Sequence, residues 1–481
     1  MKKKHRKFHH INFLQGCALL LLFYLFIAGV FYFAAGEQLY WRESGYELVS
    51  LEGDYATPEL ADGFVVKQEF FCGMDRLQQV AVPVTTFARK NSGTVTMQIY
   101  DETAGRELAS ASWDMQDVTE GQLLECNLDD RTIWHHTLSI RLSSDGKAGG
   151  AIAPWYASTV TKEDSRFSYN DEPADGTLCF FTYGKDMIWT GFHYFQIAGA
   201  GFLLLLGACC LLFYKKKYKK KSFLLNLAAL LRRYKFLIKQ LVSRDFKIKY
   251  KRSVLGALWS FVNPLLIMCV QYVVFSTIFK ADIENYQVYL LSGIVLFNFF
   301  SESSNVAMYA ISGNANLITK VYMPKYIYPV SKVLSTCVNL LISMLPLILM
   351  TLATGVKVTK AWLLIPVDLV FLLMFCMGIA LILSSILVFF RDIQFIWSVL
   401  LMALTYATPV FYPETILPDG FRATLNYNPM YQFIKCFRII VMDGVSPEPR
   451  IYLQCFGISL LYLLIGFFVF RKTQDKFIFY L

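Results

Sequence analysis

Charged residues are scarce in this sequence, and their scarcity excludes a chain that is soluble throughout. They make up 17% of its 481 residues, whereas hydrophobic residues make up 55%. Ordinary soluble domains carry about 25% charged residues. The formal net charge is +10, but the basic residues cluster beside apolar runs. There they face anionic lipid headgroups and fix orientation, so we expect membrane lipids, and no nucleic acid, as partners.

The sequence also lacks the motifs of several kinds of binding site. It contains no G-x-x-x-x-G-K-[ST] loop, so we expect no ATP site of its own. No two of its 11 cysteines have C-x-x-C spacing, and most lie in apolar stretches as small packing groups. The adjacent His135 and His136 would point to opposite faces of a strand. We therefore predict no metal site, no cofactor bound by this chain and no catalytic residues.

Two apolar runs in the first half predict transmembrane helices. The first completes segment 1–36 after a basic head; it is long enough to span a bilayer and no small-residue cleavage site follows, so we expect a retained anchor. The second belongs to segment 194–221, which ends in KKKYKKK at residues 215–221. Because basic flanks stay in the cytoplasm, segment 37–193 is predicted to be extracytoplasmic. The basic flank at residues 471–472 places the C-terminus, like the N-terminus, in the cytoplasm.

Segment 37–193 has the residue pattern of a β-domain. Apolar and polar residues alternate around Val80, Val82 and Val84, and again over residues 95–99 and 138–142, with turn residues between the runs. Several short strands separated by turns predict an all-β sandwich that is jelly-roll-like. Three cysteines fall in this segment, and whether two of them form a disulfide stays open. They are Cys72, Cys126 and Cys179.

The second half predicts a helical membrane domain. Segment 222–253 is basic and amphipathic, which is typical of a helix that lies in the membrane interface. Segment 254–481 contains six apolar segments, so about eight transmembrane helices are expected in total. They lie near residues 255–279, 288–308, 330–354, 362–390, 393–411 and 451–470. Prolines interrupt residues 412–449, which we predict to form a re-entrant or interfacial helix pair at the outer mouth.

Several motifs follow one another in a fixed order between residues 234 and 476. They are RDFKIKY (244–250), GALW (256–259), NP (263–264), NLITK (316–320), MP (323–324), FFRD (389–392), TPV (408–410), NP (428–429) and Arg438. In this order they resemble the permease subunit of ABC-2-type exporters that serve O-antigen, capsule and teichoic-acid export. The resemblance covers roughly half of the chain and does not explain the first helix or the β-domain.

The resemblance implies a homodimer that exports a lipid-linked glycan across the bacterial cytoplasmic membrane. Two copies of a separate P-loop ATPase, using ATP and Mg²⁺, would drive it. A coupling helix, or alternatively a plain cytoplasmic loop, would comprise Asn316, Leu317, Ile318, Lys320, Met323 and Pro324. A gate helix that steers the pyrophosphate of the carrier, or alternatively a solvated interfacial anchor, would comprise Arg244, Lys247, Lys249, Tyr250, Lys251 and Arg252.

Two further groups of residues are candidates for contact with the glycan. Glu302 is ionisable within an apolar segment, and with Phe297 and Phe300 it forms a set of candidate pore residues. Rings in such segments are more often lipid-facing or core. In the β-domain the candidate glycan contacts are Trp113, Trp134, Trp155 and Tyr156, and the alternative is that these rings fill the sandwich core.

Three other functions compete with polysaccharide export. An ABC-2 exporter of small lipids or drugs is the nearest, but the RDFKIKY segment and the proline-rich outer region favour a polymer. A polytopic membrane enzyme of cell-envelope glycan modification would need a catalytic dyad near a membrane face, and none stands out. A sensor or scaffold would not need six further spans with ordered motifs.

Overall fold

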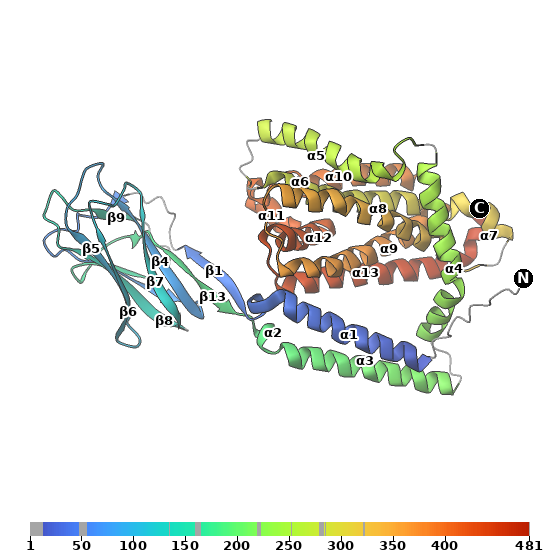
Figure 1. The fold of residues 1–481 in the computed structure, drawn as a ribbon, viewed down its shortest axis with the longest axis horizontal. Helices are drawn as coiled ribbons and strands as arrows, with labels where there is room; N and C mark the ends of the chain where they lie inside the picture. Colours follow the sequence, from blue (N-terminus) through green and yellow to red (C-terminus); the bar gives the residue numbers. More distant parts are fainter. Residues whose placement is uncertain are drawn as a thin grey trace, which may run out of the picture. The chain divides into compact units, whose positions relative to one another are not determined.

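The computed structural model describes residues 13–47, 55–133, 135–158, 165–218, 223–251, 253–278, 283, 285–320 and 323–480. The chain forms two compact units. The described residues of 37–194 form one, and those of 1–36 and 195–481 form the other. The first is a β-domain and the second is helical (Figure 1), which confirms the predicted fold class.

Two antiparallel sheets make up the β-domain. The seven-stranded sheet has the order β1-β13-β4-β9-β12, with β7 also paired to β4 and β2 to β9; the six-stranded sheet has the order β11-β10-β3-β8-β5-β6. The strands are β1 (Trp41–Glu47), β2 (Tyr55–Ala56), β3 (Val66–Cys72), β4 (Arg76–Thr85), β5 (Thr94–Asp101), β6 (Arg106–Asp114), β7 (Leu123–Thr132), β8 (His136–Ser144), β9 (Ala153–Ala157), β10 (Arg166–Tyr169), β11 (Glu172–Pro173), β12 (Thr177–Leu178) and β13 (Phe181–Met187).

The alternating residues form the core between the two sheets, as the sequence predicts. Val80, Val82 and Val84 of β4 are fully buried, as are Met97 of β5 and Ile140 of β8. Side chains of period two point to one face of a strand, so one apolar face of each sheet packs against the other. The three cysteines of the domain are buried free thiols, so no disulfide joins them.

A charge cluster on the six-stranded sheet makes the β-domain sensitive to acid. Burial opposes ionisation of Glu102, but bonds from Lys67, Ser139 and Arg141 outweigh it and lower its pKa to about 2. Glu102 Oε1 forms ion pairs with Lys67 Nζ at 2.9 Å and with Arg141 Nη2 at 3.0 Å. A carboxyl whose pKa is depressed by folding stabilises the fold above its ordinary pKa, and the stabilisation disappears as pH falls to the folded-state value.

We predict that Glu102→Gln destabilises segment 37–194 at pH 7 by on the order of 1 kcal/mol, because solvent screening weakens a partly exposed pair. The difference from the wild type should shrink below pH 4.5 and vanish below pH 2. Thermal unfolding of the segment across this pH range measures it. Glu107→Gln, at an exposed position of β6, is the control, and an equal effect of both variants would contradict the assignment.

The helical unit begins with two long apolar helices, α1 (Phe13–Ala35) and α3 (Tyr194–Lys217), joined through the β-domain. Figure 1 shows α1 and α3 side by side. Tyr24 of α1 donates a 2.9 Å hydrogen bond to the carbonyl of Ala198, and Tyr32 packs on Phe195 at 5.1 Å between ring centroids. None of the α3 side chains is buried, as expected for a helix that faces lipid.

The remaining helices form a bundle around α6, whose residues are mostly buried. They are α4 (Phe223–Tyr250), α5 (Trp259–Ile278), α6 (Tyr286–Met308), α7 (Ala315–Lys320), α8 (Ile327–Ala353), α9 (Ile365–Phe389), α10 (Ile393–Ala407), α11 (Asp419–Leu425), α12 (Pro429–Arg438), α13 (Pro449–Thr473) and α14 (Phe477–Tyr480), with α2 (Trp189–Phe192) in the β-domain. Helices α9 and α13 approach closely because Gly378 and Gly466 face each other without side chains between their backbones.

Within the described residues, six helices are long and apolar enough to cross a membrane: α1, α3, α5, α8, α9 and α13. Helix α6 has 23 residues, which is sufficient length, but it is more polar and lies inside the bundle. Helix α10 is apolar and has 15 residues. These two helices occupy the remaining segments that the sequence predicts to span.

Candidate functional site

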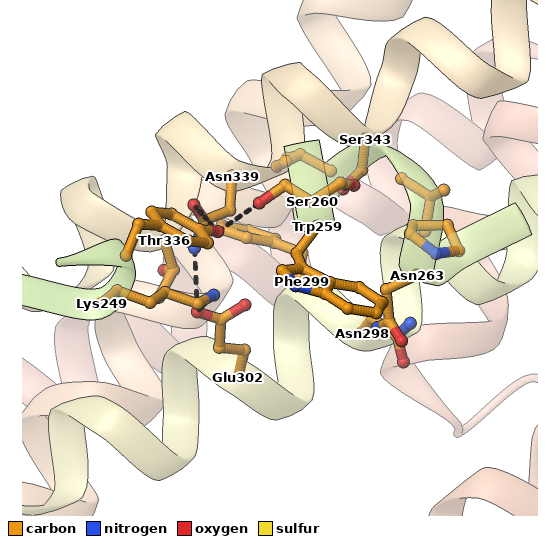
Figure 2. A pocket seen from close by; sticks show the side chains of 14 residues that line it. Lys249, Trp259, Ser260, Asn263, Asn298, Phe299, Glu302, Thr336, Asn339 and Ser343 are labelled. Atoms are coloured by element: carbon orange, nitrogen blue, oxygen red, sulfur yellow. Dashed lines mark hydrogen bonds and ion pairs between the residues drawn. The ribbon is translucent and has the colours of Figure 1, made fainter. Parts of the chain in front are cut away.

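The basic helix α4 ends at a polar pocket that it forms with three helices of the bundle (Figure 2). Its amphipathic pattern explains its position. Leu241 is buried against the bundle, while the basic residues of its last turns are exposed. Asp245 anchors it by a 3.0 Å ion pair to Lys332 of α8. The last residues of α4, Lys249 and Tyr250, therefore reach the pocket.

The pocket is a cavity of about 310 Å³ between the end of α4 and helices α5, α6 and α8. It is lined by polar groups and by the three aromatic rings of Tyr250, Trp259 and Phe299. The lining residues are Lys249, Tyr250, Trp259, Ser260, Asn263, Pro264, Val295, Asn298, Phe299, Glu302, Thr336, Asn339, Leu340 and Ser343. A cavity of this size admits one sugar or phosphate group, and its polar lining would hydrogen-bond with either.

An ion pair in the lining of the pocket joins two of the predicted residue sets. Lys249 Nζ lies 2.6 Å from Glu302 Oε1, and Asn339 Nδ2 donates to the same oxygen at 2.9 Å. The Tyr250 hydroxyl donates to Asn339 Oδ1 at 3.1 Å and also hydrogen-bonds to Ser260. Figure 2 shows Lys249 of α4, Ser260 of α5, Glu302 of α6 and Asn339 of α8 with their side chains close together. The pair is 42% and 33% exposed, so the lysine remains accessible to an anion.

The other predicted gate and pore residues lie outside this pocket. Arg244 pairs with the neighbouring Asp245 at 2.9 Å, Lys247 and Lys251 are exposed, and Arg252 lies outside the described residues. Phe297 and Phe300 are buried in the bundle core, where Phe300 stacks on Phe375 at 5.5 Å. Their packing is that of core residues in this chain, and their pore role stays a prediction.

The proline-rich region between α10 and α13 is tied to the bundle by Arg438. Its guanidinium donates to the carbonyl oxygens of Pro409, Val410 and Tyr289 at 2.8, 2.9 and 3.1 Å. It also lies 3.4 Å from the Tyr289 ring centroid. At the start of α12, Asn428 Oδ1 caps the helix by accepting from Met430 N at 3.0 Å. Asn428 Nδ2 also donates to Thr408 Oγ1 at 2.8 Å, so three of the motifs, TPV, the second NP and Arg438, meet at one place.

The predicted coupling segment forms the short helix α7, which is anchored through one face. Ile318 is buried in a cluster with Tyr328, Val388, Phe470 and Phe477, and Leu317 and Met323 pack against this cluster. Asn316 and Lys320 are exposed, and Pro324 is half-buried. Ile318 therefore supports α7 from within the chain, and the exposed side chains are those available to a partner.

The predicted glycan contacts of the β-domain have different surroundings. Trp113 packs against the sandwich core, because it is in phase with the inward residues of β6. Trp155 is half-buried on β9, and Trp134 lies outside the described residues. Tyr156 also packs against the core but contacts the exposed Tyr55, at 6.0 Å between centroids. The structure thus assigns Trp113 to the core.

Comparison with known proteins identifies relatives for the second half of the chain. The profile of the ABC-2 type transporter family matches residues 236–442, so the β-domain lies outside the match. The chain is 31% identical over 249 residues to the O-antigen export system permease protein RfbA of Myxococcus xanthus, covering 96% of that protein and 51% of this chain. It is 29% identical over 248 residues to RfbA of Klebsiella pneumoniae, covering 93% of that protein and 50% of this chain. It is 24% identical over 250 residues to the polysialic acid transport protein KpsM of Escherichia coli, covering 95% of that protein and 50% of this chain.

Proposed function

This chain belongs to the ABC-2 type transporter family, among its polysaccharide export permeases, and we propose that it exports a lipid-linked polysaccharide or teichoic-acid-like polymer. It is a multi-pass protein of the cytoplasmic membrane. The observation that carries the proposal is the likeness to O-antigen and capsule export permeases over nearly their whole length.

The polar pocket gives the proposal a point of entry for substrate. A lipid-linked glycan carries phosphate beside its first sugars, and Lys249 offers a cation next to hydroxyl and amide groups. Lysine binds phosphate as a point charge. In the substrate-free protein, Glu302 forms an ion pair with Lys249. A phosphate that binds Lys249 would therefore displace the Glu302 carboxylate. Trp259, 42% exposed at the pocket wall, offers an aromatic face to a sugar ring.

The energy would come from a separate ATPase that docks on α7. The sequence contains no phosphate-binding loop of its own. The buried face of helix α7 packs against residues of the neighbouring helices. A displacement of α7 by the ATPase would therefore move these helices with it. By analogy with the family, two such chains and two ATPases would form the working complex.

Lys320→Glu is predicted to release the ATPase while leaving the thermal stability of the permease unchanged, because its side chain is exposed. Ile318→Ala is predicted to lower stability by about 2–5 kcal/mol, since it leaves a cavity in a packed cluster. Purification in mild detergent followed by mass spectrometry measures the amount of P-loop ATPase retained. Retention by Lys320→Glu, or no ATPase with the wild type, would argue against docking at α7.

The basic flanks of the apolar helices support a specific orientation. Lys215, Lys216 and Lys217 end α3, and Arg471 and Lys472 end α13. Positive flanks favour the cytoplasmic side, so both termini would be cytoplasmic and the β-domain extracytoplasmic. Proteolysis of intact cells or spheroplasts from outside should cleave the β-domain; protection of that domain would reverse the orientation.

The β-domain would contact the glycan after it leaves the membrane. The exposed ring of Tyr55 beside Tyr156 is an aromatic surface suited to a sugar ring, whereas Trp155, which precedes Tyr156 on β9, points to the opposite face of the strand. Segment 37–194 should therefore bind glycan isolated from the same cells, and Tyr55→Ala and Trp155→Ala, tested separately, should show which of the two faces carries the binding. No binding by the wild-type segment would assign it another role.

A further inference from the structure

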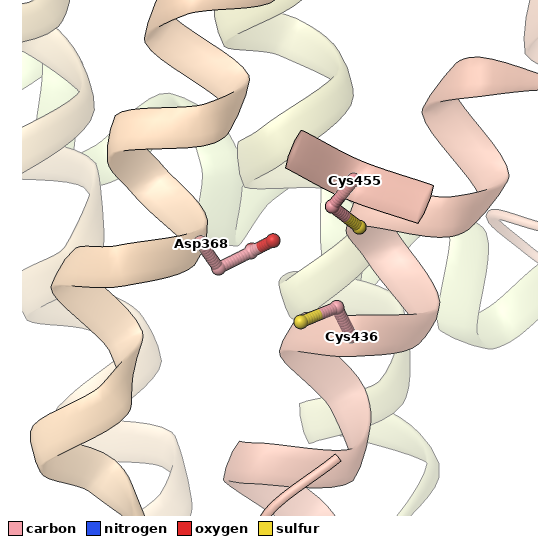
Figure 3. A group of neighbouring side chains, drawn as sticks. All are labelled: Asp368, Cys436 and Cys455. Atoms are coloured by element: carbon pink, nitrogen blue, oxygen red, sulfur yellow. The ribbon is translucent and has the colours of Figure 1, made fainter. Parts of the chain in front are cut away.

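Three buried side chains meet where α9, α12 and α13 come together (Figure 3). Asp368 lies in the first turn of α9, Cys436 in α12 and Cys455 near the start of α13. All three are fully buried. One carboxylate oxygen and the two sulfur atoms lie within 4.8 Å of one another, so each of the three helices contributes one donor to a single point.

The carboxylate of Asp368 is unusual because nothing in the described part of the chain satisfies it. Both of its oxygens are buried without a hydrogen-bond partner, although Figure 3 shows the side chain pointing toward the two cysteines. The Cys436 thiol lies beside it, but a thiol is only a weak hydrogen-bond donor. Burying an unpaired polar group costs free energy, so a native structure is expected to supply a partner for such a group.

We propose that Asp368, Cys436 and Cys455 bind a zinc-like divalent metal ion. Thiolates and carboxylates are zinc ligands, with Zn–S distances of about 2.3 Å. Two sulfurs on one tetrahedral ion lie about 3.8 Å apart by the same geometry, so donors spaced within 4.8 Å need only a small contraction. Each thiol loses its proton as its sulfur binds the metal. A donor outside these three residues completes the tetrahedron.

The unsatisfied carboxylate favours a metal over the other states of these residues. A disulfide between Cys436 and Cys455 would leave both oxygens of Asp368 without partners. Protonation of Asp368 would remove its charge but would leave the buried carboxyl group with only the two cysteine sulfurs beside it, which are weak hydrogen-bond partners. One cation satisfies all three side chains together.

The proposed ion would fasten the proline-rich region to the bundle. Cys436 lies on α12, which is almost entirely buried, and its partners lie on α9 and α13, the pair of helices that pack through Gly378 and Gly466. The site is separate from the polar pocket and from α7. Its presence does not depend on the transported substrate.

Metal analysis of the intact complex tests the proposal. The complex is purified from cells grown with zinc, and separately with cobalt, and its metal content is measured by elemental mass spectrometry. We expect about one zinc ion per chain and, with cobalt, a thiolate-to-cobalt absorption band. Asp368→Asn, Cys436→Ser and Cys455→Ser should lose both signals. Cys376→Ser should keep both signals, because it removes a fully buried cysteine of α9 that is not one of the three proposed ligands.

Other results would overturn the proposal. Only traces of metal in the wild-type complex would exclude the site, as would metal that persists in all three variants. Two alkylation-resistant cysteines that peptide mass spectrometry identifies as a 436–455 disulfide would assign the pair to oxidation instead. If the variants fail to fold, the wild-type zinc content and cobalt band decide alone, because they need no substitution.

Discussion

Arg438→Ala is expected to lower the thermal stability of this protein more than the removal of an exposed charge such as Lys239 or Arg450 from the helical bundle. The side chain satisfies the carbonyl oxygens of Pro409, Val410 and Tyr289. Each buried carbonyl left unpaired costs about 1–3 kcal/mol, so we expect a loss on the order of 3 kcal/mol or more. Arg438→Lys should recover little, because one ammonium group cannot replace a planar fork with several donors.

A second substitution tests the same contact from the opposite side. A Cβ atom on Gly293 would lie 2.8 Å from Arg438 Nη2 and 3.1 Å from Val410, so Gly293→Ala should displace the guanidinium. In an exposed helix, a change from glycine to alanine would stabilise the fold by about 1 kcal/mol through helix propensity. Displacement of the guanidinium would instead destabilise it, so the sign of the stability change distinguishes the two effects.

Thermal unfolding in detergent, followed by intrinsic fluorescence, measures both variants. Arg450→Ala, which removes an exposed arginine at the start of α13, is the matched control and should leave the midpoint unchanged. A wild-type midpoint for Arg438→Ala would show that the three carbonyls find other partners.

Lys249→Gln is expected to reduce export about tenfold while hardly changing stability. A partly exposed ion pair such as Lys249–Glu302 contributes only about 0–1 kcal/mol to folding, whereas losing 1.4 kcal/mol of substrate interaction is a tenfold effect. If Lys249 receives the phosphate, its loss affects transport far more than the midpoint of unfolding.

Glu302→Gln separates this role from a purely structural one. It leaves Lys249 in place without its carboxylate partner, so lipid-linked substrate should bind more tightly and leave more slowly. Combined with Lys249→Gln, it should have no further effect. Lys239→Gln, at an exposed position almost three turns earlier on α4, is the control. Equal export by Lys249→Gln and Lys239→Gln would reduce α4 to an interfacial anchor.

The long-range pairings of the site were beyond sequence analysis, whereas the local elements were not. Hydropathy placed α6 within two residues, at 288–308 against Tyr286–Met308. It extended α10 to residue 411, but the helix ends at Ala407 because a residue before proline disfavours helical backbone. The strand alternation around Val80 predicted the core of the sandwich, and the same alternation along β6 would have assigned Trp113 to it.

The functional residues show the same division. Lys249 and Tyr250 were predicted as members of the gate helix, and Glu302 separately as an ionisable residue within an apolar segment. Nothing in a single sequence indicates that residues separated by 53 positions form one ion pair. The sequence does not indicate that Asn339 and Ser260 belong to the pocket, because isolated small polar residues are common in apolar helices. Asp368 and the two cysteines lie on three different helices, so no local spacing marks them as one cluster.

ATP-dependent translocation in inverted membrane vesicles tests polysaccharide export most directly. Vesicles are prepared from cells whose sugars are radiolabelled, and the lipid-linked glycan that becomes protected inside is counted after ATP is added. We predict that protection of the glycan requires ATP, this chain and its ATPase. We also predict that Lys249→Gln reduces the amount of protected glycan about tenfold. Glycan that enters equally well in vesicles depleted of this chain would contradict export by this permease.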